Sequence, residues 1–283
     1  MARILAIANQ KGGVGKTTTC VNLAASLAAM KKRVLLVDLD PQGNATTGSG
    51  VDKYEVEQST YDVLVDGTPI SQVIQRAEEA NFDVLPANSD LTAAEVELLE
   101  IENKERRLQT ALKAIIANYD YVLVDCPPSL NMLTLNALVA ADGVVIAMQC
   151  EYFALEGLSA LVGTINKVTE TVNPELQIEG ILRTMYDPRN SLTNEVSAQL
   201  ESHFGDKLYR TVVPRNVRLA EAPSYGLPIM HYDSKSRGAK AYLALAGEIV
   251  RREELLAEKP GPATSETSDS DSVDNKDGVH LWR

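Results

Sequence analysis

The sequence predicts an α/β protein with a doubly wound, mostly parallel sheet and helices on both faces. Short apolar runs alternate along the chain with stretches of helical spacing, which is the pattern of parallel strands joined by crossover helices. A glycine-rich segment separates the first strand from the first helix, and two later strands end in aspartate. The chain has 283 residues, 45% of them hydrophobic, which is enough for one large core without a second module.

Seven strands are expected, each an apolar run bounded by glycine, proline or polar residues. They cover residues 3–8, 33–38, 81–86, 119–125, 143–149, 177–184 and 208–213. The first helix is expected over 18–30 and the last strong helix over 238–257. We therefore expect one folded domain over 1–257, followed at 258–283 by an acidic, Ser/Thr-rich tail that is disordered because it has too few apolar residues to bury.

The segment between the first strand and the first helix has the composition of a phosphate-binding loop. Its glycines let successive backbone N–H groups curl around phosphate oxygens, and the helix N-terminus adds partial positive charge. Lys16 is expected to reach the β- and γ-phosphates of a nucleotide, and Thr17 to ligate Mg²⁺. The expected nucleotide-binding residues of this loop are Lys11, Gly12, Gly13, Val14, Gly15, Lys16, Thr17 and Thr18.

The loop departs from the ordinary pattern GxxxxGK(S/T) at one position. That pattern requires glycine at position 10, but this chain has Gln10 there and a second lysine, Lys11, directly after it. A loop with a spare lysine defines a narrower class of nucleotide-binding protein than a perfect match would.

Two apolar strands end in carboxylates that a metal–nucleotide site needs. The strand at 33–38 leads into Asp38 and Asp40, and the strand at 119–125 ends at Asp125. Ligands of parallel α/β sheets bind beyond the carboxyl ends of the strands, so Asp40, Asp125 and the loop should converge there. Asp125 has the position of an acid that holds Mg²⁺ through water, and Asp40 that of a residue orienting the attacking water. For Asp38 a structural and a functional role are both open.

Five segments carry a family resemblance, which extends from about residue 1 to 250. KGGVGKTT at 11–18, VDLDPQGNAT at 37–46, DCPPSL at 125–130, QCEYFALEGL at 149–158 and PRNVRLAEAPSYGLPI at 214–229 resemble the ParA/MinD family of deviant Walker A ATPases, with a P-loop NTPase fold. Within that family the chain is most similar to the chromosomal ParA (Soj) branch. The resemblance implies a chromosome- or plasmid-partitioning ATPase that hydrolyses ATP slowly with Mg²⁺.

The resemblance also implies a role for the spare lysine. In this family Lys11 reaches across a dimer interface into the partner's nucleotide, where a cation supplied to the transferring phosphoryl group accelerates hydrolysis. Lys11, Lys16 and Asp40 are thus the expected catalytic residues. The homodimer would depend on ATP, and Gly12 would lie where the two subunits touch, so that a side chain there should prevent the dimer.

The net charge of −12 argues against a nucleic-acid partner, yet basic residues gather between 183 and 240. By resemblance, the ATP-bound dimer binds nucleoid DNA without sequence preference, and a ParB-type centromere-binding protein stimulates hydrolysis. The DNA-contact candidates are Arg189 and Arg218, with weaker candidates at Lys235, Arg237 and Lys240. The resemblance further implies that Pro214 and Asn216 lie at the adenine base, although Asn216 could instead cap the following helix.

A MinD-like membrane-associated positioning ATPase is the main alternative, because it shares the loop sequence but ends in a basic amphipathic helix. Here the last helix leads into acidic residues instead, and no apolar run is long enough to span a membrane. We therefore expect a cytoplasmic, nucleoid-associated protein with no membrane partner.

Three scattered cysteines are expected to be buried thiols, which excludes a cluster-binding electron-transfer ATPase. The final residues, 279–283, contain the only tryptophan and have the character of a short docking motif or an idle terminus.

Overall fold

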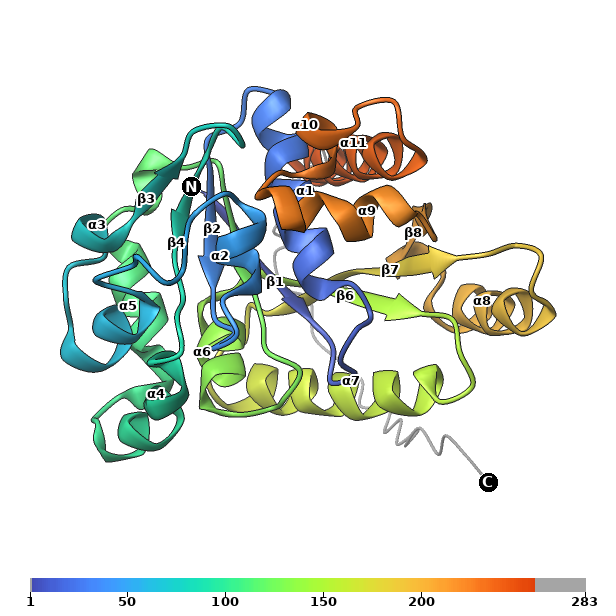
Figure 1. Cartoon of the computed structure of the whole chain (residues 1–283). Coiled ribbons are helices and arrows are strands. Elements are labelled where there is room, and N and C mark those ends of the chain that lie inside the picture. Colours follow the sequence, from blue (N-terminus) through green and yellow to red (C-terminus); the bar gives the residue numbers. More distant parts are fainter. Residues whose placement is uncertain (1, 258–283) are drawn as a thin grey trace, which may run out of the picture.

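A computed structural model describes residues 2–257 and has an eight-stranded sheet with helices on both faces (Figure 1). The strand order is β3-β4-β2-β5-β1-β6-β7-β8. Every neighbouring pair is parallel except β3 with β4. The doubly wound, mostly parallel sheet expected from the sequence is therefore confirmed. The expected tail at 258–283 lies outside the described residues.

All seven expected strands are present, and none of their ends differs by more than two residues from the expected one. Their bounds are β1 Arg3–Ala8, β2 Val34–Asp38, β4 Phe82–Leu85, β5 Tyr121–Asp125, β6 Gly143–Gln149, β7 Gln177–Tyr186 and β8 Leu208–Pro214. The sequence prediction missed an eighth strand, β3 (Gln75–Ala77). This strand has three residues and forms the antiparallel edge of the sheet, so it lacks the apolar run that marks the buried strands.

Helices connect the parallel strands, as crossover connections require. Their bounds are α1 Lys16–Ala29, α2 Asn44–Gly48, α3 Ile70–Val73, α4 Leu91–Glu97, α5 Arg107–Lys113, α6 Met132–Ala140, α7 Ala154–Thr171, α8 Ser191–Phe204, α9 Val217–Glu221, α10 Ile229–Tyr232 and α11 Arg237–Ala257. The first helix begins two residues earlier than expected, directly at Lys16. No helix within residues 2–257 is long and apolar enough to cross a membrane.

The core has two halves because strand side chains alternate between the two faces of the sheet. On β1, Ile4 and Ala6 pack with α4 to α8, whereas Leu5 and Ile7 pack with α1 and α11. All four side chains are buried. The sheet is therefore covered on both faces, and the loops at the carboxyl ends of its strands are left to form a site.

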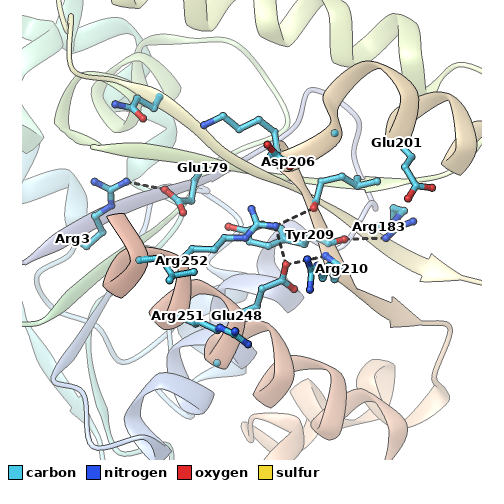
Figure 2. Close-up of a pocket in the computed structure, with 16 residues that line it drawn as sticks. Arg3, Glu179, Arg183, Glu201, Asp206, Tyr209, Arg210, Glu248, Arg251 and Arg252 are labelled. Carbon is cyan, nitrogen blue, oxygen red and sulfur yellow. Dashed lines mark hydrogen bonds and ion pairs between the residues drawn. The ribbon is translucent and has the colours of Figure 1, made fainter. Parts of the chain in front are cut away.

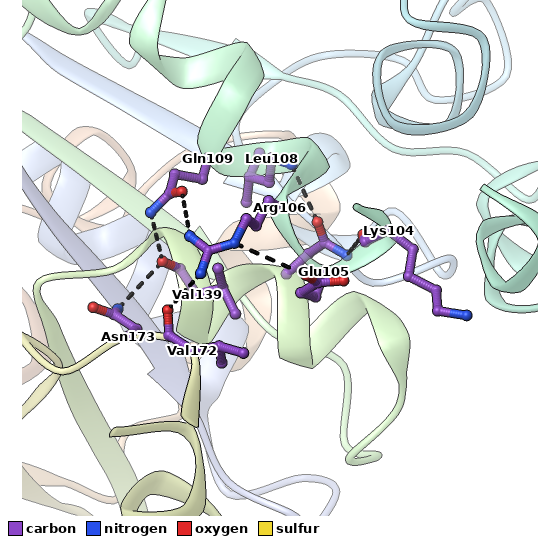
Figure 3. A network of polar contacts seen from close by, with 9 residues as sticks. Lys104, Glu105, Arg106, Leu108, Gln109, Val139, Val172 and Asn173 are labelled. Carbon is purple, nitrogen blue, oxygen red and sulfur yellow. Dashed lines mark hydrogen bonds and ion pairs between the residues drawn. The ribbon is translucent and has the colours of Figure 1, made fainter. Parts of the chain in front are cut away.

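A polar network holds α5 and α6 against the end of α7 (Figure 3). The Arg106 guanidinium donates to the Val172 carbonyl over 2.9 Å, and the Gln109 amide donates to the Val139 carbonyl over 3.1 Å. The buried Asn173 amide donates to the same Val139 oxygen over 3.2 Å. These bonds satisfy backbone carbonyls at the ends of α6 and α7 that have no partner within their own helices.

Candidate functional site

A cavity of about 570 Å³ lies at the carboxyl ends of the central strands. The glycine-rich loop forms one wall, and the segment that joins β8 to α9 forms another. Among the expected site residues, the lining includes Gly12, Gly13, Gly15, Lys16, Thr17, Thr18, Asp40, Pro214 and Asn216. The structure therefore brings the loop, the candidate water-orienting acid and the candidate base-binding residues into one cavity.

The loop between β1 and α1 depends on two left-handed glycines. Gly13 has φ of 73° and Gly15 has φ of 90°, a region that a side chain enters only with strain. Across the sheet, the Thr184 hydroxyl at the end of β7 donates to the Val14 carbonyl over 2.7 Å. Asn9 accepts a hydrogen bond from the Lys11 amide over 3.0 Å and donates to the Ala147 carbonyl over 2.7 Å. Thr184 and Asn9 thus fix the loop, and sequence reasoning had missed both.

Lys16 points into this loop. Its side chain is buried, and its ammonium donates to the Lys11 carbonyl over 3.2 Å. Desolvation lowers the pKa of Lys16, while the nearby Asp125 carboxylate opposes that shift. Among residues 2–257 the buried ammonium therefore has one long hydrogen bond, to the loop, which leaves it able to bind phosphate oxygens.

Lys11 points away from the loop to which it belongs. Its ammonium forms an ion pair with Glu151, in the segment between β6 and α7. Both side chains remain partly exposed, 47% for Lys11 and 43% for Glu151. Glu151 lies within the QCEYFALEGL motif, but nothing in the sequence assigned it to Lys11. In the single chain the two lysines therefore occupy different surroundings, one buried at the loop and one at the surface.

Asp125 ends β5 beneath the loop and is completely buried. Burial raises its pKa well above the usual value, and the neighbouring Asp38 carboxylate raises it further. Thr17 and Lys16 oppose this rise, yet neither carboxylate oxygen has a hydrogen-bond partner of regular geometry within residues 2–257. A buried carboxylate with no partner is costly unless a cation or ordered water compensates it. This arrangement fits a divalent cation bound beside Thr17.

The metal would not be held by protein side chains alone. Within residues 2–257, no group of three or more His, Cys, Asp or Glu side chains is arranged to hold an ion. Mg²⁺ usually keeps several waters and is bound by one or two protein groups together with substrate phosphates. The donor set at Thr17 and Asp125 agrees with that type of site.

Asp38 and Asp40 have different surroundings. Asp38 is fully buried and accepts hydrogen bonds from the Thr46 amide over 2.8 Å, the Thr46 hydroxyl over 2.7 Å and the Asp40 amide over 3.1 Å. Burial raises the pKa of Asp38 to about 6. Asp40 lies on the cavity wall, where one carboxylate oxygen accepts from the Gln42 amide over 3.0 Å. Asp38 therefore holds the loop after β2 in place, while Asp40 faces the space that a substrate would occupy.

Asn216 caps the following helix and also lies on the cavity wall. Its side-chain oxygen accepts a hydrogen bond from the Arg218 amide over 2.9 Å and so caps α9. The residue also lines the cavity together with Pro214, and no hydrogen bond from its amide nitrogen is found within residues 2–257. The capping bond fixes the side chain, and its nitrogen remains able to donate to a nucleotide base.

The expected DNA-contact residues fall into two groups. Arg189 is 87% exposed and pairs with Asp187 over 2.7 Å, and Arg218 pairs with Glu221 over 2.8 Å. The hydrogen bond to Asp187 raises the pKa of Arg189, and the hydrogen bond to Glu221 raises that of Arg218. The second group, Lys235, Arg237 and Lys240, is exposed and has no ion pair within the described part of the chain. Lys235, Arg237 and Lys240, the weaker candidates from the sequence, are thus the ones whose side chains pair with no carboxylate of residues 2–257 that would compete with a DNA phosphate.

A second cavity, of about 960 Å³, lies at the opposite ends of β7 and β8 (Figure 2). The first residues of these strands line it, whereas their last residues line the nucleotide-sized cavity. Several of its charges compensate one another, since Arg3 pairs with Glu179 and Arg252 with Glu248, each over 2.8 Å. The cavity is separated from the loop by the length of the sheet, so it contributes nothing to the chemistry there.

All three cysteines are buried and unpaired, as expected from their spacing. Burial raises the pKa of the Cys20 thiol well above its usual value and raises that of Cys150 to about 11. Thiols with raised pKa values are poor nucleophiles. The cysteines therefore belong to the packing of the core.

Comparisons with known proteins identify relatives that extend over most of this chain. A family model described as an AAA domain matches residues 2–178. The chain is 55% identical over 250 residues to the sporulation initiation inhibitor protein Soj of Bacillus subtilis, covering 88% of this chain and 99% of Soj. It is 53% identical over 253 residues to the chromosome partitioning protein ParA of Caulobacter vibrioides, covering 89% of this chain and 95% of that protein.

A solved structure supports the same relationship. Cobyrinic acid a,c-diamide synthase from Mycobacterium smegmatis, with bound ADP and magnesium, superposes with a TM-score of 0.79 at 37% sequence identity. The match covers 90% of this chain and 96% of that protein. The fold expected from the sequence is therefore also the fold of a solved nucleotide-binding relative.

Proposed function

Because this chain belongs to the ParA/MinD family of deviant Walker A ATPases, we propose that it is a partitioning ATPase that separates replicated chromosomes or plasmids. The observation that carries the proposal is that the two lysines of one loop have different surroundings. Lys16 is buried at the cavity, and Lys11 is held at the surface by Glu151. The identities of 55% and 53% to proteins named Soj and ParA favour partitioning over the activity named for the 37% identical Mycobacterium protein.

ATP and Mg²⁺ are the ligands that suit the cavity. The amides of residues 12–18 and the Lys16 ammonium would bind the phosphates. Thr17 and, through water, Asp125 would hold Mg²⁺, which supplies charge neutralisation between the phosphates. Pro214 would contact the adenine ring, and the Asn216 amide nitrogen would donate to it. The magnesium bound in the solved Mycobacterium structure supports this arrangement. So does the Asp125 carboxylate, whose oxygens have no hydrogen-bond partner of regular geometry within residues 2–257.

Hydrolysis would need two subunits. Asp40 would orient the attacking water, since its carboxylate faces the cavity beside the loop. Lys11 would leave Glu151 and extend into the partner's nucleotide, where it stabilises the charge that develops on the transferred phosphoryl group. A single chain therefore binds ATP but hydrolyses it slowly.

The ATP-bound dimer would bind DNA without sequence preference through Lys235, Arg237 and Lys240, with Arg189 and Arg218 added when their acidic partners release them. One helix, α11, connects the nucleotide cavity with two of the candidate DNA-contact residues. Tyr242 of α11 lines the nucleotide cavity, and its hydroxyl lies 3.2 Å from that of Thr19 on α1. Arg237 and Lys240 belong to the first turn of the same helix. A nucleotide that shifts α11 would also shift its cations.

A ParB-type centromere-binding protein would stimulate hydrolysis and release the dimer from DNA. The protein would then act in the cytoplasm, on the nucleoid. The identities of 55% and 53% to proteins named Soj and ParA support this part of the proposal.

The membrane-associated alternative is disfavoured by α11. An amphipathic helix that lies on lipid needs a free apolar face. Five apolar side chains of α11 are instead buried against α1 and β8, namely Ala239, Tyr242, Leu245, Ala246 and Ile249. Leu243 and Leu255 are exposed, so among residues 237–255 the main apolar face of the helix is already covered and only single apolar side chains remain outside it. Co-sedimentation with anionic vesicles in the presence of ATP distinguishes the alternatives, because binding to vesicles but not to DNA would support the membrane function.

The dimer is tested by Gly12→Val. A Cβ built on Gly12 meets no atom within 4 Å, and the residue is not left-handed, so the single chain should fold normally. Analytical ultracentrifugation with ATP should find dimers of the wild-type chain and monomers of the variant. A variant that dimerises like the wild type would contradict the proposed contact.

A further inference from the structure

An apolar groove of about 740 Å³ lies between α7 and α8 and plays no part in nucleotide binding. Leu155 and Ala160 line it from α7, and Leu192 and Val196 line it from α8. Tyr152, directly before α7, closes one end with a ring that is 74% exposed. Exposed apolar surface of this kind usually marks a site of contact.

The rim of the groove is acidic. Glu156 and Glu195 are both exposed, and neither has an ion pair within residues 2–257. A suitable occupant therefore combines apolar side chains with positive charge. Residues 279–283, Val-His-Leu-Trp-Arg, have this composition. They follow a stretch at 264–278 that is rich in serine and acids and has Val273 as its only apolar residue.

The position where the described chain ends makes the groove reachable. Leu255, near the end of α11, lines the same cavity as Glu201 and Gly205 at the end of α8, so these two helix ends are neighbours. From Glu201 back to Leu192, α8 rises by about 14 Å at 1.5 Å per residue. The 21 residues between Ala257 and Val279 would span about 25 Å as a random coil, and several times that when extended.

We propose that residues 279–283 dock in the α7/α8 groove of their own chain, with Leu281 and Trp282 against its apolar floor and Arg283 beside the acidic rim. Tryptophan is suited to such a site because it buries a large apolar area while its indole N–H can find a polar partner at the edge. Gln199 and Ser159 supply polar atoms there.

Docking would also act on the proposed dimer, a consequence that rests on the proposed function. Tyr152 adjoins Glu151, which holds Lys11, so an occupant at that end of the groove lies beside the surface from which Lys11 reaches the partner. Residues 279–283 would compete with the second subunit. A chain ended at Ala257 should then dimerise with ATP at a several-fold lower protein concentration, and unchanged dimerisation would overturn the competition.

The docking itself is tested without nucleotide, because Trp282 is the only tryptophan of the chain. In the full-length protein its fluorescence should be blue-shifted relative to the urea-unfolded chain, and acrylamide should quench it several-fold less efficiently. Both properties should be independent of protein concentration. A synthetic peptide of residues 276–283 should show the same shift when the chain ended at Ala257 is added.

Matched variants locate the site. Ala160→Glu places a charge in the groove and should return the emission to that of an exposed tryptophan. Asn166→Glu makes the same change in charge at an exposed position of α7 outside the groove and should leave the emission unchanged. An unshifted wild-type emission, a shift that Ala160→Glu does not remove, or one that appears only at high protein concentration would each overturn the proposal.

Discussion

Lys16→Ala and Lys11→Ala should separate the two functions of the loop. The buried Lys16 ammonium faces the nucleotide cavity, and a hydrogen bond to a charged group contributes about 1.5–3 kcal/mol. Its removal should weaken ATP binding by about 10- to 150-fold. The Lys11 ammonium contacts Glu151 outside the cavity, so Lys11→Ala should change ATP affinity by less than about twofold, within the energy of one exposed ion pair.

The assay is a titration with a fluorescent ATP analogue and Mg²⁺, followed by single-turnover hydrolysis. Lys113→Ala, at an exposed site on α5 far from the loop, controls for the loss of a surface charge. Lys11→Ala should bind ATP and fail to hydrolyse it, whereas Lys16→Ala should fail at binding. Equal losses of ATP affinity in the two variants would refute the distinction between the lysines.

The remaining predictions concern single residues. Asp40→Ala should keep ATP affinity within about twofold but slow hydrolysis by about 10²- to 10⁴-fold, and a normal turnover rate would exclude Asp40 as the water-orienting group. Gly15→Ala should lower the free energy of unfolding in urea by about 1–2 kcal/mol because φ is 90°, whereas Gly157→Ala, inside α7 with free space around it, should not. Burial raises the pKa of Asp38 from 3.8 to about 6, so the folded state binds this proton more tightly than the unfolded state does. Its contribution to stability is therefore greatest below pH 4 and falls by about 3 kcal/mol in all as the pH rises through and above 6, a loss that Asp38→Asn should remove from the pH profile of urea unfolding. If Lys235, Arg237 and Lys240 of both subunits contact DNA, log K should fall with log salt with a slope near −5, and a slope close to zero would contradict these contacts.

Most of the fold follows from local patterns in the sequence. The seven strands that were predicted each have an apolar run, and a glycine or proline close behind the run ends most of them. The edge strand β3 escaped prediction because Gln75 and Arg76 are polar and because its only neighbour, β4, gives it no second ladder. Edge strands carry little of the hydrophobic signal on which such predictions depend.

The parts of the site that come from one short segment of the chain could be predicted from the sequence. The contacts between segments far apart in the sequence could not. The position of the loop at 11–18 between a strand and a helix, and of Asp40 and Asp125 beyond the carboxyl ends of strands, was expected from apolar runs and spacing. The bonds from Thr184 to Val14 and from Lys11 to Glu151 cross 170 and 140 residues of sequence. They exist only because β6 lies next to β1 in the sheet and β7 lies next to β6. No local pattern contains that information.

The ion pairs of Arg189 and Arg218 were also missed from the sequence, but for a different reason. Arg189 follows its partner Asp187 by two residues, and Arg218 precedes Glu221 by three, so both pairs could have been proposed from the sequence. Such exposed pairs contribute little to stability. Their relevance is to binding, because an arginine that already pairs with a carboxylate gives less attraction for a phosphate group.

DNA binding as a function of nucleotide tests the central claim most directly. Co-sedimentation with non-specific DNA should be measured with ATP, with ADP and without nucleotide, for the wild-type chain, Asp40→Ala and Gly12→Val. The account predicts binding of the wild-type chain with ATP only, prolonged binding of Asp40→Ala after ATP is added, and no binding of Gly12→Val. Binding that is equally strong with ADP or without nucleotide would contradict a switch that depends on two subunits closing around ATP.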